Sequence, residues 1–148
     1  MKKLIYLAVM LTGLSAYAST DPDVNAKVLK AFHETFTNAS NVIWSEVEDN
    51  GYKANFEMSQ IQVRALYDTD GNLLETVRYY DERALPVNIV AGIKKQYPGK
   101  KIFGVTEIST DNDIAYHVTL RDEKNWYVVK SDPYANITLS KKFKDANQ

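Results

Sequence analysis

The feature that most constrains the fold is a change of hydrophobic period along the chain, from helical to strand-like, which occurs twice. Between residues 24 and 36 every fourth residue is apolar, as in a helix with one buried face. Between residues 52 and 58 apolar and polar residues alternate, as in a strand with one buried face. A second stripe of apolar residues with helical spacing follows Leu85-Pro86, and apolar and polar residues alternate again over 116–120. Both passages therefore place a helix before a sheet.

Each helical segment precedes four segments that are expected to be strands. The helices are predicted at 23–36 and 85–97; the strands are predicted at 42–48, 52–58, 62–67 and 73–80, then at 102–108, 114–120, 126–130 and 137–143. This order predicts an α+β fold made by tandem duplication of a unit of one helix and a four-stranded antiparallel sheet. The helices are expected to pack on one sheet face, and the two repeats, 24–84 and 85–144, are expected to form one compact domain.

The N-terminus has the layout of a secretory signal peptide. Lys2 and Lys3 precede an apolar run over residues 4–14, and Ala16-Tyr17-Ala18 fits the cleavage rule. We therefore expect a signal peptide at 1–18 and a linker at 19–23, and a protein that is periplasmic or secreted. The apolar run is too short for a membrane span, which needs about 20 residues.

The charge balance argues against nucleic acid as a partner. Removal of Lys2 and Lys3 leaves 16 basic against 19 acidic residues, a net charge of −3. Such a chain creates no field that attracts phosphate. The sequence contains no cysteine, so the exported domain is expected to fold without disulfides.

Several short motifs carry a family resemblance. They are Val42-Ile43-Trp44, the segment from Tyr52 to Phe56, the hairpin from Tyr67 to Leu74, Leu85-Pro86 and Tyr97-Pro98-Gly99. Over residues 24–143 the chain resembles the PepSY-like, β-lactamase-inhibitor-protein-like family of secreted or periplasmic proteins. The resemblance implies a duplicated helix-plus-four-strand unit and a non-catalytic module that binds or restrains other proteins. The inhibitor for which the family is named carries disulfides, so inhibition of a β-lactamase is not expected of this cysteine-free chain.

No residue pattern predicts a catalytic or metal site, and the chain is not expected to be an enzyme. His33 and His117 lie far apart, and neither has a serine and an acid in a local motif. The absence of cysteine and of closely spaced histidines argues against zinc. Asp68 and Asp70 begin a segment like a calcium loop, but its glycine stands fourth and its next acid eighth, instead of sixth and twelfth. A hairpin turn is the favoured interpretation, and no metal or cofactor is expected.

Alternation also predicts which side chains face away from the helices. Tyr52, Phe56, Tyr116 and Val118 are expected in the core, whereas Lys53, Asn55, His117 and Thr119 are expected on the other side. The predicted partner-binding residues on that open face are Arg64, Arg78, Tyr80, His117, Trp126 and Lys130. Arg, Tyr and Trp are enriched at protein interfaces. The competing interpretation is that these side chains are solvated or covered by a terminus, and a register error of one residue would reverse the assignment.

These observations predict an exported, non-catalytic binding module, acting as a protein or peptidase inhibitor, that uses its open sheet face. The partner is expected to be a protein or peptide of the cell envelope. The alternative is an envelope protein that binds a small ligand, such as a glycan or lipid, between the two repeats. A hydrolase that uses His33 or His117 is the least favoured hypothesis.

Overall fold

The computed structural model describes residues 23–48 and 51–146. The elements, in chain order, are α1 (Ala26–Thr35), β1 (Ser40–Val47), β2 (Gly51–Met58), β3 (Ile61–Tyr67), β4 (Leu73–Tyr80), the short 3-10 helix η2 (Glu82–Ala84), α2 (Val87–Gln96), β5 (Lys101–Thr110), β6 (Ile114–Arg121), β7 (Asn125–Ser131) and β8 (Ile137–Lys144). The fold is α+β, as expected. The predicted signal peptide at 1–18 and most of the linker at 19–23 lie outside the described residues.

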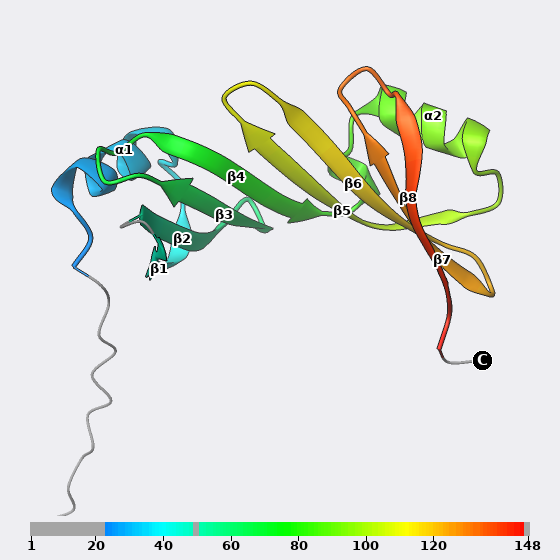
Figure 1. The fold of residues 1–148 in the computed structure, drawn as a ribbon, viewed down its shortest axis with the longest axis horizontal. Coiled ribbons are helices and arrows are strands. Elements are labelled where there is room, and N and C mark those ends of the chain that lie inside the picture. Colours follow the sequence, from blue (N-terminus) through cyan, green and yellow to red (C-terminus); the bar gives the residue numbers. More distant parts are fainter. Residues whose placement is uncertain (1–22, 49–50, 147–148) are drawn as a thin grey trace, which may run out of the picture.

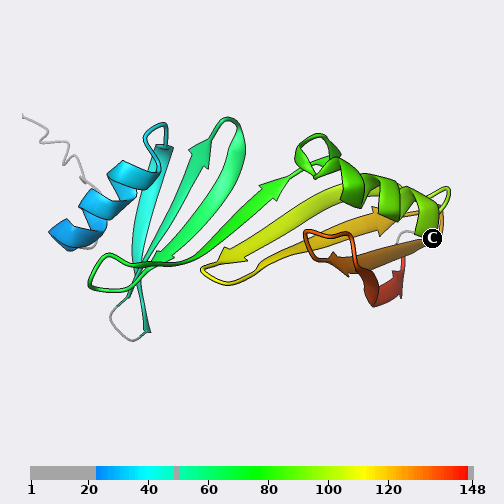
Figure 2. The ribbon, with the colours of Figure 1, turned by 90° about the horizontal axis from the view of Figure 1, so that it is seen from above.

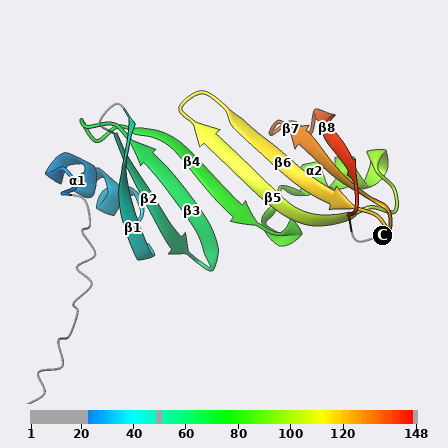
Figure 3. The ribbon, with the colours of Figure 1, turned by 60° about the horizontal axis from the view of Figure 1, so that its bottom comes forward.

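The prediction of a tandem duplication with two four-stranded sheets is wrong. The strands form one eight-stranded antiparallel sheet in the order β1 to β8 (Figure 3). The two expected sheets are joined because β4 pairs with β5, from Glu75 opposite Thr110 to Tyr80 opposite Val105. Without this pairing, both strands would leave a row of backbone N–H and C=O groups without partners, which is unfavourable for a sheet. Hydrogen bonding therefore continues across the whole molecule.

Local signals explain where the two helices begin and end. The Asn25 side chain caps α1, since its Oδ1 accepts a hydrogen bond from the Lys27 N–H at 2.8 Å. Helix α2 begins directly after Pro86, where a missing backbone N–H costs nothing. Its last turn carries Lys94 and Lys95, whose charges favour the carbonyl end of the helix.

Both helices lie on the same side of the sheet, at its two ends (Figures 1 and 2). Helix α1 buries Val28 and Phe32 in a first core cluster, with Ala54, Phe56, Val63, Ala65 and Tyr67 of the sheet. Helix α2 buries Ile89 and Ile93 in a second core cluster, with Leu85, Val105, Tyr116, Val118, Leu120, Tyr127 and Val129. The strand register links the two clusters. Val63 pairs with Arg78 and Val105 pairs with Tyr80, two residues further along β4 on the same face. We call this side the helix face.

Phe32 is the centre of the first core cluster. It is 2% exposed, and its ring centroid lies 5.4 Å from Phe36, 5.1 Å from Trp44 and 5.0 Å from Phe56. The edge-to-face arrangement with Trp44 and Phe56 is favourable for aromatic rings. A change at this position would therefore leave a cavity within the cluster.

We expect Phe32→Ala to lower the free energy of unfolding by about 3 to 5 kcal/mol, because it removes a buried aromatic ring. Urea denaturation measures this loss. Tyr134→Ala is the matched control, since Tyr134 is 85% exposed and its removal should change the value by about 0.5 kcal/mol or less.

The two core clusters share no buried residue. In Phe32→Ala, amide hydrogen exchange should therefore rise more in β2 and β3 than in β6 and β7. An equal rise in all four strands would show that the two clusters open as one unit.

Candidate functional site

The candidate site is the side of the sheet opposite the helices, which we call the open face. Strand alternation and cross-strand pairing place a set of side chains on this face, away from the two core clusters. They are Lys53, Asn55, Arg64, Val77, Ile108, His117, Thr119, Val128 and Lys130. Tyr52, Phe56, Tyr116 and Val118 lie on the helix face, as alternation predicted; Phe56 and Val118 are fully buried. No helix among the described residues packs on the open face.

The middle of the open face shields its own apolar residues. Val77 is 1% exposed although it lies on the side without helices. Its cross-strand neighbours are Arg64 and Ile108, so its cover comes from side chains of the sheet. A twisted and curved sheet brings the side chains of one face together in this way.

The β1 to β4 half of the open face has mixed charge. Arg64 Nη2 lies 3.6 Å from Glu75 Oε1, and both side chains are partly exposed. A pocket of about 550 Å³ is lined by Glu46, Val47, Glu48, Lys53, Arg64, Leu66 and Glu75. Three acidic and two basic residues line this pocket, which therefore has mixed charge.

The β5 to β8 half of the open face has an aromatic cluster, which we define as Phe103, Arg121, Trp126 and Phe143. The Phe103 and Trp126 rings meet edge to face, 4.8 Å apart. The Arg121 guanidinium carbon lies 4.8 Å from the centre of the Trp126 ring, and Phe143 is the cross-strand partner of Trp126. Phe103 is 65% exposed and Phe143 is 49% exposed. Apolar rings therefore reach solvent at one end of the open face.

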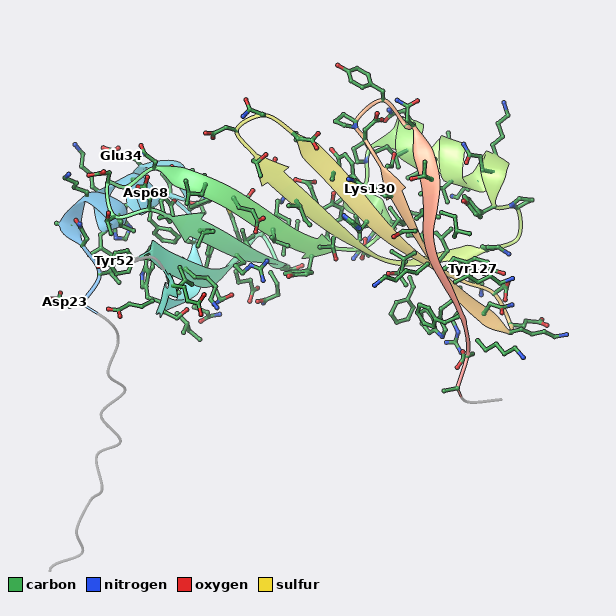
Figure 4. All side chains as sticks on the ribbon, viewed as in Figure 1. Asp23, Glu34, Tyr52, Asp68, Tyr127 and Lys130 are labelled. Carbon is green, nitrogen blue, oxygen red and sulfur yellow. The ribbon has the colours of Figure 1, made fainter. Side chains whose placement is uncertain are left out.

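This half of the sheet is also basic. Its strands contain Lys101, His117, Arg121, Lys130, Lys141, Lys142 and Lys144, and their one acidic residue is Glu107. Glu107 pairs with Arg78 on the helix face. His117 and Lys130 are cross-strand partners on the open face, and Figure 4 labels Lys130 on β7. The open face of β5 to β8 therefore combines aromatic and positive side chains without a strand carboxylate.

Four of the six predicted binding residues lie on the open face, and two do not. Arg64, His117, Trp126 and Lys130 are on it. The placement of Arg78 and Tyr80 there is wrong, because both lie on the helix face between the two core clusters. Val77, which directly precedes Arg78 in the sequence, is on the open face and is 1% exposed.

Glu107 explains how Arg78 and Tyr80 are accommodated on the helix face. Arg78 Nη1 donates to Glu107 Oε1 at 3.2 Å, and the Tyr80 hydroxyl donates to Glu107 Oε2 at 2.5 Å. Burial raises the pKa of Tyr80, and its hydrogen bond to Glu107 raises it further. Glu107 thus links Arg78 and Tyr80 between the two core clusters.

Sequence reasoning missed Phe103 because the pairing of β5 is irregular there. Ile102 pairs with Leu120 and Gly104 pairs with Thr119, so Phe103 is the extra residue between them. A bulge of this kind reorients one side chain. Gly104 next to it is the signal in the sequence, since glycine within a strand often marks a bulge.

The structure gives no support to a metal site in the described parts of the chain. They contain no group of three His, Asp or Glu side chains that converge on one point. The Asp68 carboxylate accepts hydrogen bonds from the Asp70 and Asn72 N–H groups and from the Asn72 side chain, at 2.8 to 2.9 Å. The bonds from Asn72 hold the pKa of Asp68 below its usual value. This carboxylate closes a hairpin turn, as the sequence favoured.

The two pockets described do not lie between the two halves of the chain. The larger, of about 800 Å³, is lined by Gly99, Lys101, Ile102, Phe103 and residues 121–125. It lies at one end of β5 and β6, next to the aromatic cluster. The prediction of a ligand site between the halves therefore receives no support from these pockets.

Asp122 accepts several hydrogen bonds in the β6–β7 loop, which lies between Arg121 and Trp126 in the sequence. Its carboxylate accepts hydrogen bonds from Lys100 Nζ at 2.9 Å, from the Tyr127 hydroxyl at 2.9 Å and from the Asn125 N–H at 2.8 Å. The bond from Lys100, followed by those from the Lys124 N–H and Tyr127, holds the pKa of Asp122 well below its usual range. Arg121 Nη2 also contacts Asp145 Oδ2 at 2.7 Å.

No family model matches this sequence, and no curated protein matches it. Solved structures have a similar fold. A BLIP-like (β-lactamase-inhibitor-protein-like) protein from Bacteroides fragilis NCTC 9343 has a TM-score of 0.62 at 16% identity, over 82% of this chain and 86% of that one. A DUF2874 family protein from Bacteroides uniformis ATCC 8492 has a TM-score of 0.61 at 17% identity, over 80% of this chain and 88% of that one. A candidate periplasmic protein from Bacteroides eggerthii DSM 20697 has a TM-score of 0.62 at 14% identity, over 85% of this chain and 90% of that one.

At these identities the similarity concerns the fold. The chain therefore has a BLIP-like fold, whereas the PepSY-like part of the resemblance is not shown. None of the helices in 23–48 and 51–146 is long and apolar enough to cross a membrane.

We expect Asp122→Asn to lower stability at neutral pH by an amount that shrinks in acid. The unfolded chain takes up a proton on Asp122 near pH 4, its ordinary pKa, whereas the folded chain does so only at lower pH. The contribution of Asp122 is therefore complete above about pH 4 and is lost as the pH falls toward the folded pKa. Urea unfolding of both proteins at stepped pH measures the difference. A difference that stays constant down to the most acidic pH would contradict this account.

Proposed function

We propose that this chain is an exported, non-catalytic binding module that occupies the surface of a protein partner with its open face. The observation that carries the proposal is the combination of exposed aromatic rings and positive charges on the open face of β5 to β8. Strands hold these side chains, which limits the entropy lost when a partner binds.

The chemistry of the aromatic cluster supports a protein as the partner. Phe103 and Phe143 present large apolar areas, and Trp126 is fixed between Phe103 and Arg121. Aromatic and Arg side chains of this kind contribute most of the binding energy in many protein interfaces. Because both neighbours already contact the Trp126 ring, less of it is free to stack on a sugar, so a protein is favoured over a glycan.

The comparisons support the same class of function. One structure with this fold is a BLIP-like protein and another is a candidate periplasmic protein. Together with the predicted signal peptide at 1–18, they support a role in the periplasm, where the module would restrain an envelope protein by covering its surface. Inhibition of a particular enzyme is not part of the proposal.

The test is quantitative affinity capture from the native envelope fraction with wild type, Arg64→Ala/Trp126→Ala and Arg83→Ala/Tyr134→Ala. The first variant removes one cation and one aromatic ring from the open face. The second removes the same types of group elsewhere, at positions in η2 and the β7–β8 turn, and serves as the matched control. We expect at least one envelope protein to be captured by wild type and by the control but lost with the open-face variant.

Circular dichroism would verify that all three proteins are folded. Equal recovery of every captured protein with wild type and the open-face variant would contradict the proposed use of this face.

A further inference from the structure

Strand β8 is an edge of the sheet and is available for pairing. It runs from Ile137 to Lys144, and every residue after Ile137 is exposed. It pairs with β7 on one side, and no strand in the described residues pairs with its other side. An edge strand of eight residues offers unpaired backbone N–H and C=O groups along that side.

The charge of this edge selects against some partners. Lys141, Lys142 and Lys144 follow one another along β8, and in residues 23–48 and 51–146 none of them forms an ion pair. Lys141 pairs with Val128 on the open face, whereas Lys142 pairs with Tyr127 on the helix face. The positive charges of β8 thus lie on both faces of the sheet.

A second copy of this chain is a poor occupant. Antiparallel pairing of two β8 strands would bring lysine side chains of both copies together, and like charges across strands are destabilising. A strand with acidic side chains would instead place opposite charges next to these lysines.

Apolar residues on β8 add a second requirement. Leu139 is 51% exposed and pairs with Val129 of the helix face. Phe143 is 49% exposed and belongs to the aromatic cluster of the open face. An added strand would therefore meet one exposed apolar residue on each face of the sheet as well as the lysines.

We infer that β8 binds an extended, acidic segment of a protein partner by adding it to the sheet as a ninth strand, with apolar residues interspersed among its carboxylates. Main-chain hydrogen bonds supply the affinity in this mode of recognition, and the alternating side chains supply the specificity. The inference rests on the proposed binding function and names the chemistry of the partner. It extends the contact surface from the open face to the neighbouring edge.

The test uses the full chain and fluorescein-labelled octapeptides made of Glu and Val, with fluorescence anisotropy as the readout. We expect the Glu–Val peptide to bind and the equivalent Lys–Val peptide not to bind. Lys141→Glu/Lys142→Glu/Lys144→Glu should weaken binding of the Glu–Val peptide by about tenfold or more, because attraction between the lysines and the peptide glutamates becomes repulsion. Lys30→Glu/Lys94→Glu/Lys95→Glu changes the net charge equally at the helices and should bind like wild type.

A further peptide separates strand addition from simple charge attraction. N-methylation of alternate residues of the Glu–Val peptide removes backbone donors and keeps every carboxylate. We expect the version methylated on the edge-facing N–H groups to lose binding. Equal binding of the methylated and unmethylated peptides would overturn the inference, as would equal binding by the two triple variants.

Two other results would also overturn it. One is no binding of the Glu–Val peptide to the folded wild type. The other is a dimer, in light scattering, that the β8 variant alone fails to form, because this would assign the edge to a second copy. Neither result would change the capture experiment with Arg64→Ala/Trp126→Ala, so the two proposals fail separately.

Discussion

The hydrogen-bonded pairing of β4 with β5 is the constraint on which the rest of the structure depends. It joins two groups of four strands, each with its own helix and core cluster, into one sheet. Because the register places Arg78 opposite Glu107 and Tyr80 opposite Val105, both core clusters lie on one side. The other side then forms one continuous surface that no helix of the described residues covers.

Much of the local structure could be predicted because burial leaves a period in the sequence. The alternation from Tyr52 to Met58 and from Tyr116 to Leu120 identified the buried side of β2 and β6 correctly. The pairing of β4 with β5 could not be predicted in this way. Its partners include Thr76 with Ser109 and Arg78 with Glu107, which are polar and carry no hydrophobic pattern.

The errors in the candidate site also come from contacts between strands, which leave no clear period in the sequence. Arg78 and Tyr80 were expected on the open face, whereas the strand register places both on the helix face. In the structure Val77 is buried by the sheet itself, whereas Arg78 and Tyr80 are stabilised by Glu107. Phe103 escaped prediction because a bulge, which interrupts the period, turns it toward Trp126. Contacts across strands therefore decide the composition of the site where the period of one strand is ambiguous.

The central claim is that a partner covers the aromatic and basic end of the open face. Hydroxyl-radical footprinting of the chain, alone and bound to a captured partner, tests it most directly because aromatic side chains are oxidised where solvent reaches them. The account predicts that oxidation of Phe103, Trp126 and Phe143 falls in the complex while that of Tyr134, in the β7–β8 turn, is unchanged. Protection of Tyr134 from oxidation, with no protection of Phe103, Trp126 and Phe143, would contradict this claim.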